Sequence, residues 1–452
     1  MSKGISRRGA MRAGAGVLAT GALGAPMVHA QGSGGNLRFA FWDHWVPGSN
    51  DAIRQLGARW AERNRVNLTL DFINTTGNQL QLTAAAQAQS RSGHDGISLV
   101  PWDVGAYADQ LEPVDDVIGR LVGKYGAINP VAEFLCRRNN AWRAIPATSG
   151  TQNKPALCRF DLLQRHAGID VRAMWPARNE KGPGADTWNW DTFLMAAEKC
   201  HAAGVPFGLP MGQFTDAVDW VGGLFASYGA RITDERGNPT IRNNPQLRQV
   251  MEYAVRLARF LPNDVWAWDD ASNNRALISG RSALVFNPPS AWAVAKRDAP
   301  QVAENCWTIP MPAGPQGRFL AYLPFNTGIW AFGRNKTAAK SFLEFLSERE
   351  SAEFTTNFSG GYDIPPFASM SDFAVWTTNG PPAGTIFNYP LKAHHDARPS
   401  IAFAPAPAEL ASQMYIQALN TKVIARVAQG GESIDAALGW HEREVNNMRR
   451  GG

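Results

Sequence analysis

The chain has 452 residues, 44% hydrophobic and 18% charged, a composition that excludes intrinsic disorder, collagen-like repeats and small disulfide scaffolds. At roughly 150 residues per domain, the length predicts two or three domains. The formal net charge is +5, and four of the basic residues lie within the first dozen positions. Length and charge together predict a folded multidomain protein without a basic surface for nucleic acid.

The first thirty residues have the pattern of an export signal. Four basic residues, among them Arg7 and Arg8, precede a Gly/Ala-rich apolar stretch, and Ala30 ends a small-residue cleavage pattern. The Arg7-Arg8 pair resembles the twin-arginine export motif, although Ala10 stands where that motif prefers a large apolar residue, so general secretion is the alternative. Removal of residues 1–30 would lower the net charge to +1. We expect a nearly neutral, periplasmic mature protein that binds no nucleic acid.

Export would carry the cysteines into an oxidising compartment, where they would be either disulfide-bonded or buried free thiols. They are Cys136, Cys158, Cys200 and Cys306. Their spacing matches no metal-binding motif. The sequence His394-His395-Asp396 is a weak metal candidate, because adjacent residues do not share one face of a helix or strand. We expect neither a metal ion nor a cofactor.

Along the mature chain, short apolar runs alternate with amphipathic stretches, which predicts an α/β fold with mostly parallel sheets. The first part of this pattern predicts strands at 37–41, 66–73 and 96–100, and helices at 51–63, 80–90 and from 113 onward. Strands and helices in this order form a first lobe.

The pattern changes near residue 142, where a turn-rich segment at 144–152 predicts a crossing between lobes. Beyond it we predict strands at 157–160 and 283–286, and helices at 162–167, from 190, at 218–228, 246–260 and 274–278. A Pro/Gly-rich linker at 310–317 precedes a predicted strand at 328–332 and a helix at 338–346. These elements form a second lobe and a return.

Several segments are informative through their common order and spacing. They are YADQLEPVDD at 107–116, AWRAIP at 141–146, FDLL at 160–163, TWNWDTF at 187–193, LISGRSAL at 277–284 and AAKSFLEFL at 338–346. In these segments the chain resembles the extracytoplasmic solute-binding proteins of ABC importers, in the group that contains sugar-binding members. The resemblance covers nearly the whole mature chain.

The resemblance implies a two-lobed, type II-like periplasmic-binding-protein fold, in which a solute is held between lobes that close around it. It implies an N-terminal lobe of residues 31–148 and 318–350, and a C-terminal lobe of 149–317 and 351–452. It also implies that the protein is a monomer, that it is not an enzyme, and that it delivers its solute to an ABC permease in the membrane.

The sixteen tryptophans favour a carbohydrate as the solute, because sugar sites combine aromatic platforms with polar side chains that bind hydroxyl groups. In open α/β sheets, ligands lie beyond the carboxyl ends of the strands. On this basis the candidate ligand-binding residues are Trp42, Asp43, His44 and Trp45 after the first strand, Trp102 and Asp103 after the strand at 96–100, and Gln152, Trp220, Asn287, Trp292, Asn326, Gly360 and Tyr362.

Each candidate also has a packing interpretation. Asp103 would serve equally as a helix cap, Trp220 and Trp292 as core residues, and Asn326 and Gly360 as turn residues. The tryptophans and aspartates at 266, 268, 269 and 270 are expected at an exposed surface or a helix cap rather than in the ligand site.

Three other functions remain open. Asp43 and Asp103 with nearby aromatic residues would suit a polyamine. The same two carboxylates, if they met across a cleft, would suit an exported carbohydrate-active enzyme, although no hydrolase motif supports this. A periplasmic protein that presents its ligand to a membrane sensor would share the fold and the cleft.

Overall fold

The computed structural model describes residues 35–46, 48–178, 181–287, 289–388 and 406–451. The export-signal residues Arg7, Arg8 and Ala30 and the sequence His394-His395-Asp396 lie outside these ranges. The compact unit described below lies within Gly32–Gly452. Among its described helices, none combines the length and the apolar character needed to span a membrane.

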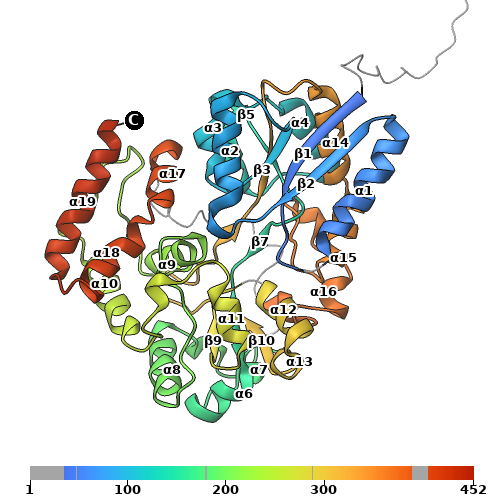
Figure 1. The fold of residues 1–452 in the computed structure, drawn as a ribbon. Helices are drawn as coiled ribbons and strands as arrows, with labels where there is room; N and C mark the ends of the chain where they lie inside the picture. Colours follow the sequence, from blue (N-terminus) through green and yellow to red (C-terminus); the bar gives the residue numbers. More distant parts are fainter. Residues whose placement is uncertain (1–34, 47, 179–180, 288, 389–405, 452) are drawn as a thin grey trace, which may run out of the picture. The chain divides into compact units, whose positions relative to one another are not determined.

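Five strands form the first sheet, in the order β2-β1-β3-β12-β6 (Figure 1). They are β1 (Asn36–Trp42), β2 (Asn67–Ile73), β3 (Gly96–Leu99), β6 (Ile145–Pro146) and β12 (Asn326–Ile329). Strand β1 pairs in parallel with β2 and β3, whereas β12 runs antiparallel to β3 and β6. The last four residues of β1 are all buried, as expected of a central strand covered on both faces.

The helices predicted near 51–63, 80–90, 113 and 338–346 are confirmed. Together with three others, they form the set of helices that covers this sheet. They are α1 (Ser49–Asn64), α2 (Gln79–Ser90), α3 (Asp103–Tyr107), α4 (Asp115–Tyr125), α5 (Pro130–Cys136), α14 (Lys336–Ser347) and α15 (Arg349–Phe358). Helix α1 buries Ile53, Leu56 and Trp60 at helical spacing, and the Trp60 ring lies 5.0 Å from that of Phe342 on α14. The late helix α14 therefore completes the core of the N-terminal sheet.

The second sheet contains β8 (Ala156–Arg159), β9 (Leu284–Val285) and β10 (Cys306–Ile309), in the order β10-β8-β9. Both of its ladders are antiparallel, so the expectation of a mostly parallel sheet is wrong for this part of the chain. A strand buried on both faces is a continuous apolar run in either direction, and its sequence therefore does not fix how it pairs.

The remaining helices surround the second sheet or follow it in the chain (Figure 1). They are α6 (Phe160–Leu162), α7 (Val171–Met174), α8 (Trp190–Ala202), α9 (Thr215–Ser227), α10 (Pro245–Ala258), α11 (Ser272–Ile278), α12 (Ser290–Asp298), α13 (Pro300–Ala303), α16 (Val375–Thr378), α17 (Ala408–Ile416), α18 (Leu419–Ala428) and α19 (Ile434–Gly451). Helix α8 begins where predicted, because the side chain of Asn189 accepts a hydrogen bond from the Thr192 backbone N–H at 2.9 Å.

Two strands connect the sheets. Strand β7 (Gln152–Asn153) pairs antiparallel with β11 (Tyr322–Leu323), and they lie on the two segments that lead from β6 to β8 and from β10 to β12. The chain thus passes from the first sheet to the second and back. This architecture confirms the two-lobed α/β fold.

The four cysteines are buried free thiols, which settles the alternative left open by the sequence. The Cys136 thiol donates to the Asn326 side-chain oxygen at 2.9 Å. Burial raises the pKa of the Cys200 thiol to about 11. The buried cysteines therefore act as packing residues.

Candidate functional site

A cavity lies between the loops that follow β1, β2 and β3, the crossing strands β7 and β11, the segment before α11, and helices α2, α9 and α12. It is lined by Trp42, Trp45, Thr75, Gln81, Val100, Pro101, Gln152, Thr215, Asp216, Asp270, Asn287, Ser290, Leu323, Phe325 and Tyr362. The space between these residues is about 490 Å³, part of it open to solvent. The enclosed volume is only about 40 Å³, well below the usual volume of small-molecule sites, about 300–1,000 Å³, so a sugar-sized solute would require the cavity to open further.

One wall of the cavity is aromatic. The ring of Trp42 stacks on Phe325 with centroids 4.6 Å apart, and Tyr362 and Trp45 lie 6.4 and 6.5 Å from it. Gly150 has φ +90°, and a Cβ atom there would lie 2.9 Å from the Trp42 ring. Glycine at 150 thus allows the crossing segment to lie against the tryptophan.

A buried network fixes the loop after β1. The Nδ1 atom of His44 accepts a hydrogen bond from the Val46 backbone N–H at 2.9 Å, so the ring proton resides on Nε2, which donates to Asp363 Oδ1 at 3.2 Å. The same carboxylate oxygen accepts from the Gly150 backbone N–H at 2.6 Å. His44, predicted to contact ligand, instead joins the loop to the crossing segment and does not line the cavity.

Asp43, the other polar candidate of this loop, does not line the cavity either. Its carboxylate accepts a hydrogen bond from Asn50 Nδ2 at 2.6 Å, and its backbone N–H donates to Ile73 O at 2.9 Å. Asp43 therefore fixes the loop against α1 and β2.

Two predicted polar residues, Gln152 and Asn287, line the cavity. The Asn287 amide donates to Asn274 Oδ1 at 2.6 Å and its carbonyl oxygen accepts from Ser290 Oγ at 2.7 Å. Both ends of Asn287 are thus held by neighbours on α11 and α12. Gln152, on β7, is 5% exposed and lies at the boundary between the lobes.

A buried ionic cluster lies behind this polar face. The ammonium of Lys154 lies 2.7 Å from Asp216 Oδ1 and 2.5 Å from Asp219 Oδ2, and the lysine side chain is 1% exposed. Asn273 donates to the other oxygen of Asp216 at 2.7 Å, and the Tyr415 hydroxyl donates to Asp219 at 3.0 Å. The two carboxylates outweigh the cost of burial and keep the pKa of Lys154 above its usual range. The cluster holds the crossing segment against α9.

Asp270 differs from these carboxylates because its Oδ1 atom is buried without a hydrogen-bond partner among the described residues. Burial, followed by the charge of Asp216, raises the pKa of Asp270 to about 7 although Lys154 opposes the shift. The sequence interpretation assigned Asp269 and Asp270 together to a surface or helix cap. The structure separates them: Asp269 accepts from Ser272 Oγ at 2.6 Å at the start of α11, and Asp270 lines the cavity.

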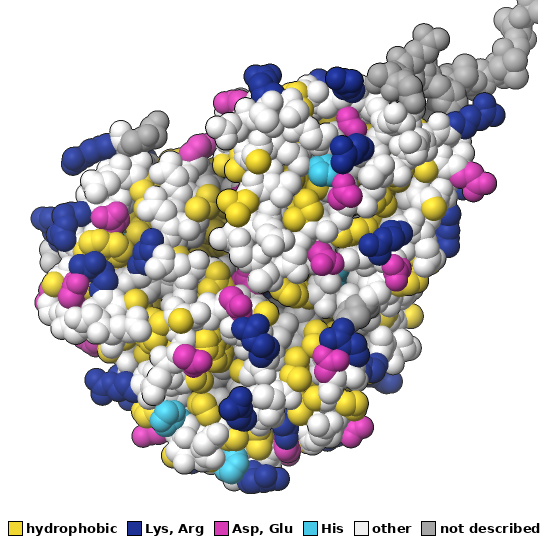
Figure 2. All heavy atoms as spheres, in the orientation of Figure 1, with side chains coloured by type: hydrophobic (Ala, Val, Ile, Leu, Met, Phe, Trp, Pro, Cys, Tyr) yellow, Lys and Arg dark blue, Asp and Glu magenta, His cyan; other side chains and the backbone are white. Residues whose placement is uncertain are grey.

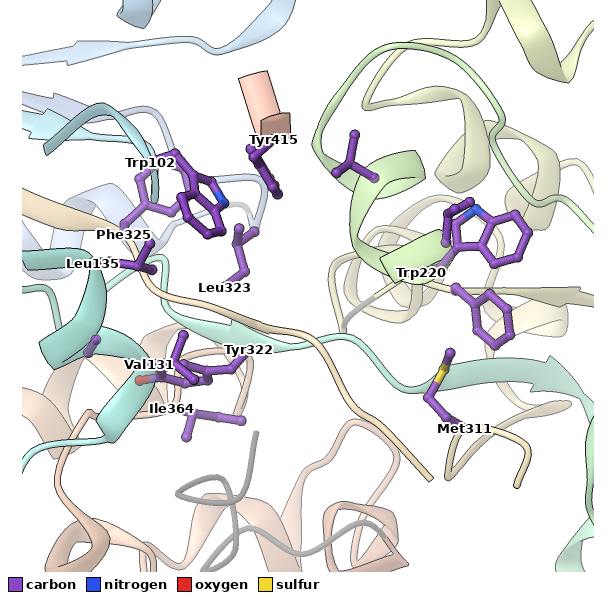
Figure 3. Packing of buried hydrophobic residues seen from close by; sticks show 14 of the residues in the cluster. Trp102, Val131, Leu135, Trp220, Met311, Tyr322, Leu323, Phe325, Ile364 and Tyr415 are labelled. Atoms are coloured by element: carbon purple, nitrogen blue, oxygen red, sulfur yellow. The ribbon is translucent and has the colours of Figure 1, made fainter. Parts of the chain in front are cut away.

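The loop after β3 contributes Val100 and Pro101 to the cavity, whereas Trp102 and Asp103 do not line it. Trp102 is 2% exposed and stacks on Tyr415 of α17 with ring centroids 4.9 Å apart, as Figure 3 shows. Asp103 is the first residue of α3, and burial raises its pKa to about 7. Trp102 and Asp103 are therefore packed in the interior and do not belong to the cavity wall.

The other predicted residues divide between cavity and core, and of them only Tyr362 lines the cavity. Trp220 is in the core and donates its indole N–H to Pro210 O at 2.7 Å, on the far side of Figure 3 from Trp102. Trp292 packs in a separate core cluster, Asn326 lies buried within β12, and Gly360 is in a turn at φ +64°.

Several lining residues were missed by the sequence interpretation, chiefly Thr75, Gln81, Thr215, Asp216 and Phe325. Two had a usable signal: Thr215 and Asp216 form the first turn of the helix predicted at 218–228, which begins three residues earlier than expected. Phe325 lies between two short strands on the return segment, and no local pattern relates it to Trp42 more than 280 positions away.

The face of the molecule drawn in Figure 2 carries charges of both signs. The face in Figure 2 shows Lys and Arg side chains interspersed with Asp and Glu, without a continuous patch of either sign. Within the described ranges, no group of three or more His, Cys, Asp or Glu side chains is arranged to hold a metal ion.

Three comparisons relate the chain to known proteins. No curated protein sequence matches it. The family model described as bacterial extracellular solute-binding protein matches residues 47–353. Among solved structures, maltose-bound MalE3 of T. maritima is 16% identical with a TM-score of 0.73, covering 91% of this chain and 99% of its own.

Two further structures are also similar in fold. A solute-binding protein of Agrobacterium vitis with bound D-mannitol is 17% identical with a TM-score of 0.69, covering 92% of this chain and 99% of its own. The cyclic α-maltosyl-1,6-maltose binding protein of Arthrobacter globiformis is 15% identical with a TM-score of 0.66, with the same coverage of 92% and 99%. At these identities the structures support the two-lobed fold, and the family model covers more than half of the sequence. This chain belongs to the bacterial extracellular solute-binding protein family.

Proposed function

We propose that this protein is the solute-binding component of an ABC importer and that its solute is a carbohydrate. The observation that carries the proposal is the cavity itself, in which Trp42, Trp45, Phe325 and Tyr362 face neutral polar side chains and two aspartates. Aromatic faces pack against the C–H groups of a sugar ring, while amide, hydroxyl and carboxylate groups bind its hydroxyls. Solved structures of this fold include complexes with maltose and D-mannitol, which supports the same solute class here.

In this proposal the solute first binds to one lobe, and closure about the crossing strands β7 and β11 then completes its contacts. The closed protein, a monomer exported through its N-terminal signal, delivers the solute to a membrane permease. No reaction is required of Asp216, because both of its carboxylate oxygens are engaged by Lys154 and Asn273. Among the described lining residues there is therefore no second free carboxylate to act with Asp270 in glycoside hydrolysis.

The test is thermal unfolding of the purified protein against a panel of mono- and oligosaccharides, polyols, polyamines and glycerophosphodiesters. A solute that binds only the native state raises the free energy of unfolding by about 2.7 kcal/mol at a hundredfold excess over Kd. We expect a shift with at least one carbohydrate and no consumption of it on long incubation. A shift with polyamines alone would disprove the carbohydrate assignment, and consumption of a glycan would disprove the binding-only function.

A further inference from the structure

The charges around the cavity do not balance. Its lining includes Asp216 and Asp270, and of the described lining residues none is lysine, arginine or histidine. The nearest cation is Lys154, which is already paired with both Asp216 and Asp219. One buried ammonium therefore serves three carboxylates, and among the described residues Asp270 is the one of them without an ion pair or side-chain hydrogen bond.

Other atoms in the wall also lack partners. Trp42 is 5% exposed, and its indole N–H is buried without a hydrogen-bond partner among the described residues. The side-chain oxygen of Gln81 is likewise buried without a hydrogen-bond partner among the described residues. A buried polar atom without a partner is costly, so these groups point to a ligand that supplies both donors and acceptors.

We infer that the solute is an amino sugar, whose protonated amino group binds beside Asp270 while its ring packs on Trp42 and Trp45. This inference rests on the proposed function and names the class of carbohydrate. An ammonium would donate hydrogen bonds to the carboxylate and also neutralise the excess negative charge, whereas a hydroxyl group would only donate. A hydrogen bond to an ionised carboxylate is already stronger than a neutral one, and the opposite charge of an ammonium adds an attraction that a hydroxyl lacks. The partly exposed ring of Trp45 adds a further attraction for a cation.

The neutral lining residues favour a sugar over a linear polyamine. Thr75, Gln81, Gln152 and Thr215 all line the cavity and offer hydroxyl or amide groups in addition to the two aspartates. A polyamine has only amines and methylene groups, so it would leave the donors among these side chains without acceptors. A ring bearing several hydroxyls and one amine can bind both the neutral polar side chains and the aspartates.

Calorimetric titration at pH 7 with matched pairs tests the inference: glucosamine against glucose, galactosamine against galactose, and the β-1,4 dimer of glucosamine against cellobiose, with spermidine as a cation without hydroxyls. We expect at least one amino sugar to bind about tenfold or more tightly than its neutral partner. Asp270→Asn should remove this preference, whereas Asp264→Asn, the same change at an exposed site outside the cavity, should leave it intact.

Titration at pH 5 supplies a second readout. The carboxyl of Asp270 faces Asp216 and Asp219 on α9, Lys154 on the crossing segment and its neighbour Asp269, and with a pKa of about 7 it is largely protonated at pH 5. Because only the ionised fraction would bind the ammonium, the affinity for the amino sugar should fall more than about tenfold from pH 7 to pH 5. The affinity of Asp270→Asn should change much less.

The outcomes separate the two proposals. If neutral sugars bind as tightly as their amino partners, or if Asp270→Asn keeps the preference, the inference is wrong and the carbohydrate function stands. If spermidine binds and no sugar does, both are wrong. If no member of this panel binds, the amino-sugar inference is contradicted, and the wider thermal panel decides the carbohydrate function.

Discussion

The loops that follow the parallel strands β1 and β3 carry the same kinds of residue, but one contributes to the cavity wall and the other packs against a helix. The last residue of β1, Trp42, and Trp45 in the loop after it lie in the cavity wall, whereas the loop after β3 places Trp102 against Tyr415 of α17. Both tryptophans next to the strands are buried, at 5% and 2% exposure. The difference arises from what packs over each loop: a glycine-containing crossing segment over Trp42, and a helix from the C-terminal part of the chain over Trp102.

The comparison shows what can be predicted from the position of a residue just after a strand. It correctly brings Trp42, Trp45 and the residues after β3 to one edge of the sheet, because the carboxyl ends of parallel strands share that edge. It does not tell which side chains a distant helix will cover. Five predictions test this division between cavity wall and packing contact, beginning with the largest effect.

Lys154→Met should have the largest effect on stability. It leaves Asp216 and Asp219 buried without their cation, and loss of one partner of a buried ion pair costs about 3–5 kcal/mol in free energy of unfolding. Urea denaturation measures the loss. Lys181→Met is the matched control, since the exposed Lys181–Asp186 pair should contribute less than about 1 kcal/mol. A loss below 1 kcal/mol for Lys154→Met would show that the cluster does not hold the crossing segment.

Trp102→Ala should lower the free energy of unfolding by about 3 kcal/mol, because the stack on Tyr415 is buried. Trp102→Phe keeps an aromatic face and should recover much of this. At ligand saturation of the folded protein, neither variant should lose selectivity between solutes. A variant as stable as the native protein but selective for a different solute would place Trp102 in the ligand site.

Trp45→Ala should affect solute binding more than stability, the reverse of what is expected for Trp102→Ala. Trp45 is only partly buried, so its removal should cost little stability but weaken solute binding by about tenfold, equivalent to about 1.4 kcal/mol. Titration of the solute found in the thermal panel provides the measurement. Trp268→Ala removes a partly buried tryptophan outside the cavity and should leave Kd unchanged. Equal losses in both variants would contradict the aromatic wall.

Tyr415→Phe should destabilise the protein less than Trp102→Ala does, since it keeps the stack on Trp102 but removes the hydroxyl that donates to Asp219. A hydrogen bond to a charged group contributes about 1.5–3 kcal/mol, and the Lys154 ion pair should offset part of its loss. We expect a decrease of about 1.5 kcal/mol in urea denaturation. A decrease as large as that of Trp102→Ala would assign the packing contact to the hydroxyl instead of the ring.

His441 should produce the smallest effect, and its pH dependence must be separated from that of Asp270. It is fully buried, and among the described residues its ring nitrogens have no hydrogen-bond partner, so burial lowers its pKa from 6.5 to about 3. Between these values the unfolded chain binds a proton that the native protein does not, so stability falls as pH falls. From pH 6.5 to 5.5 the loss should be about 1 kcal/mol. His441→Gln should flatten this slope in urea titrations, and an unchanged slope would assign it to other groups.

The sequence predicted most of the architecture because the periodic burial of α1, α2 and β1 is local. Pairing direction in the second sheet was not predictable, since buried strands such as β8 carry no directional pattern. Of the residues predicted to bind ligand, those that line the candidate cavity are Trp42, Trp45, Gln152, Asn287 and Tyr362. Asp270 was missed because its neighbour Asp269 fits a helix cap, and only tertiary contacts distinguish the two carboxyls.

The most direct measurement is a crystal structure of the protein with the carbohydrate that gives the largest thermal shift. The account predicts that the sugar ring lies against Trp42 and Trp45, with a polar substituent within hydrogen-bond distance of Asp270. Solute bound elsewhere, for example in the surface groove that contains Trp268, Arg275 and Arg281, would contradict the assignment of this cavity as the binding site.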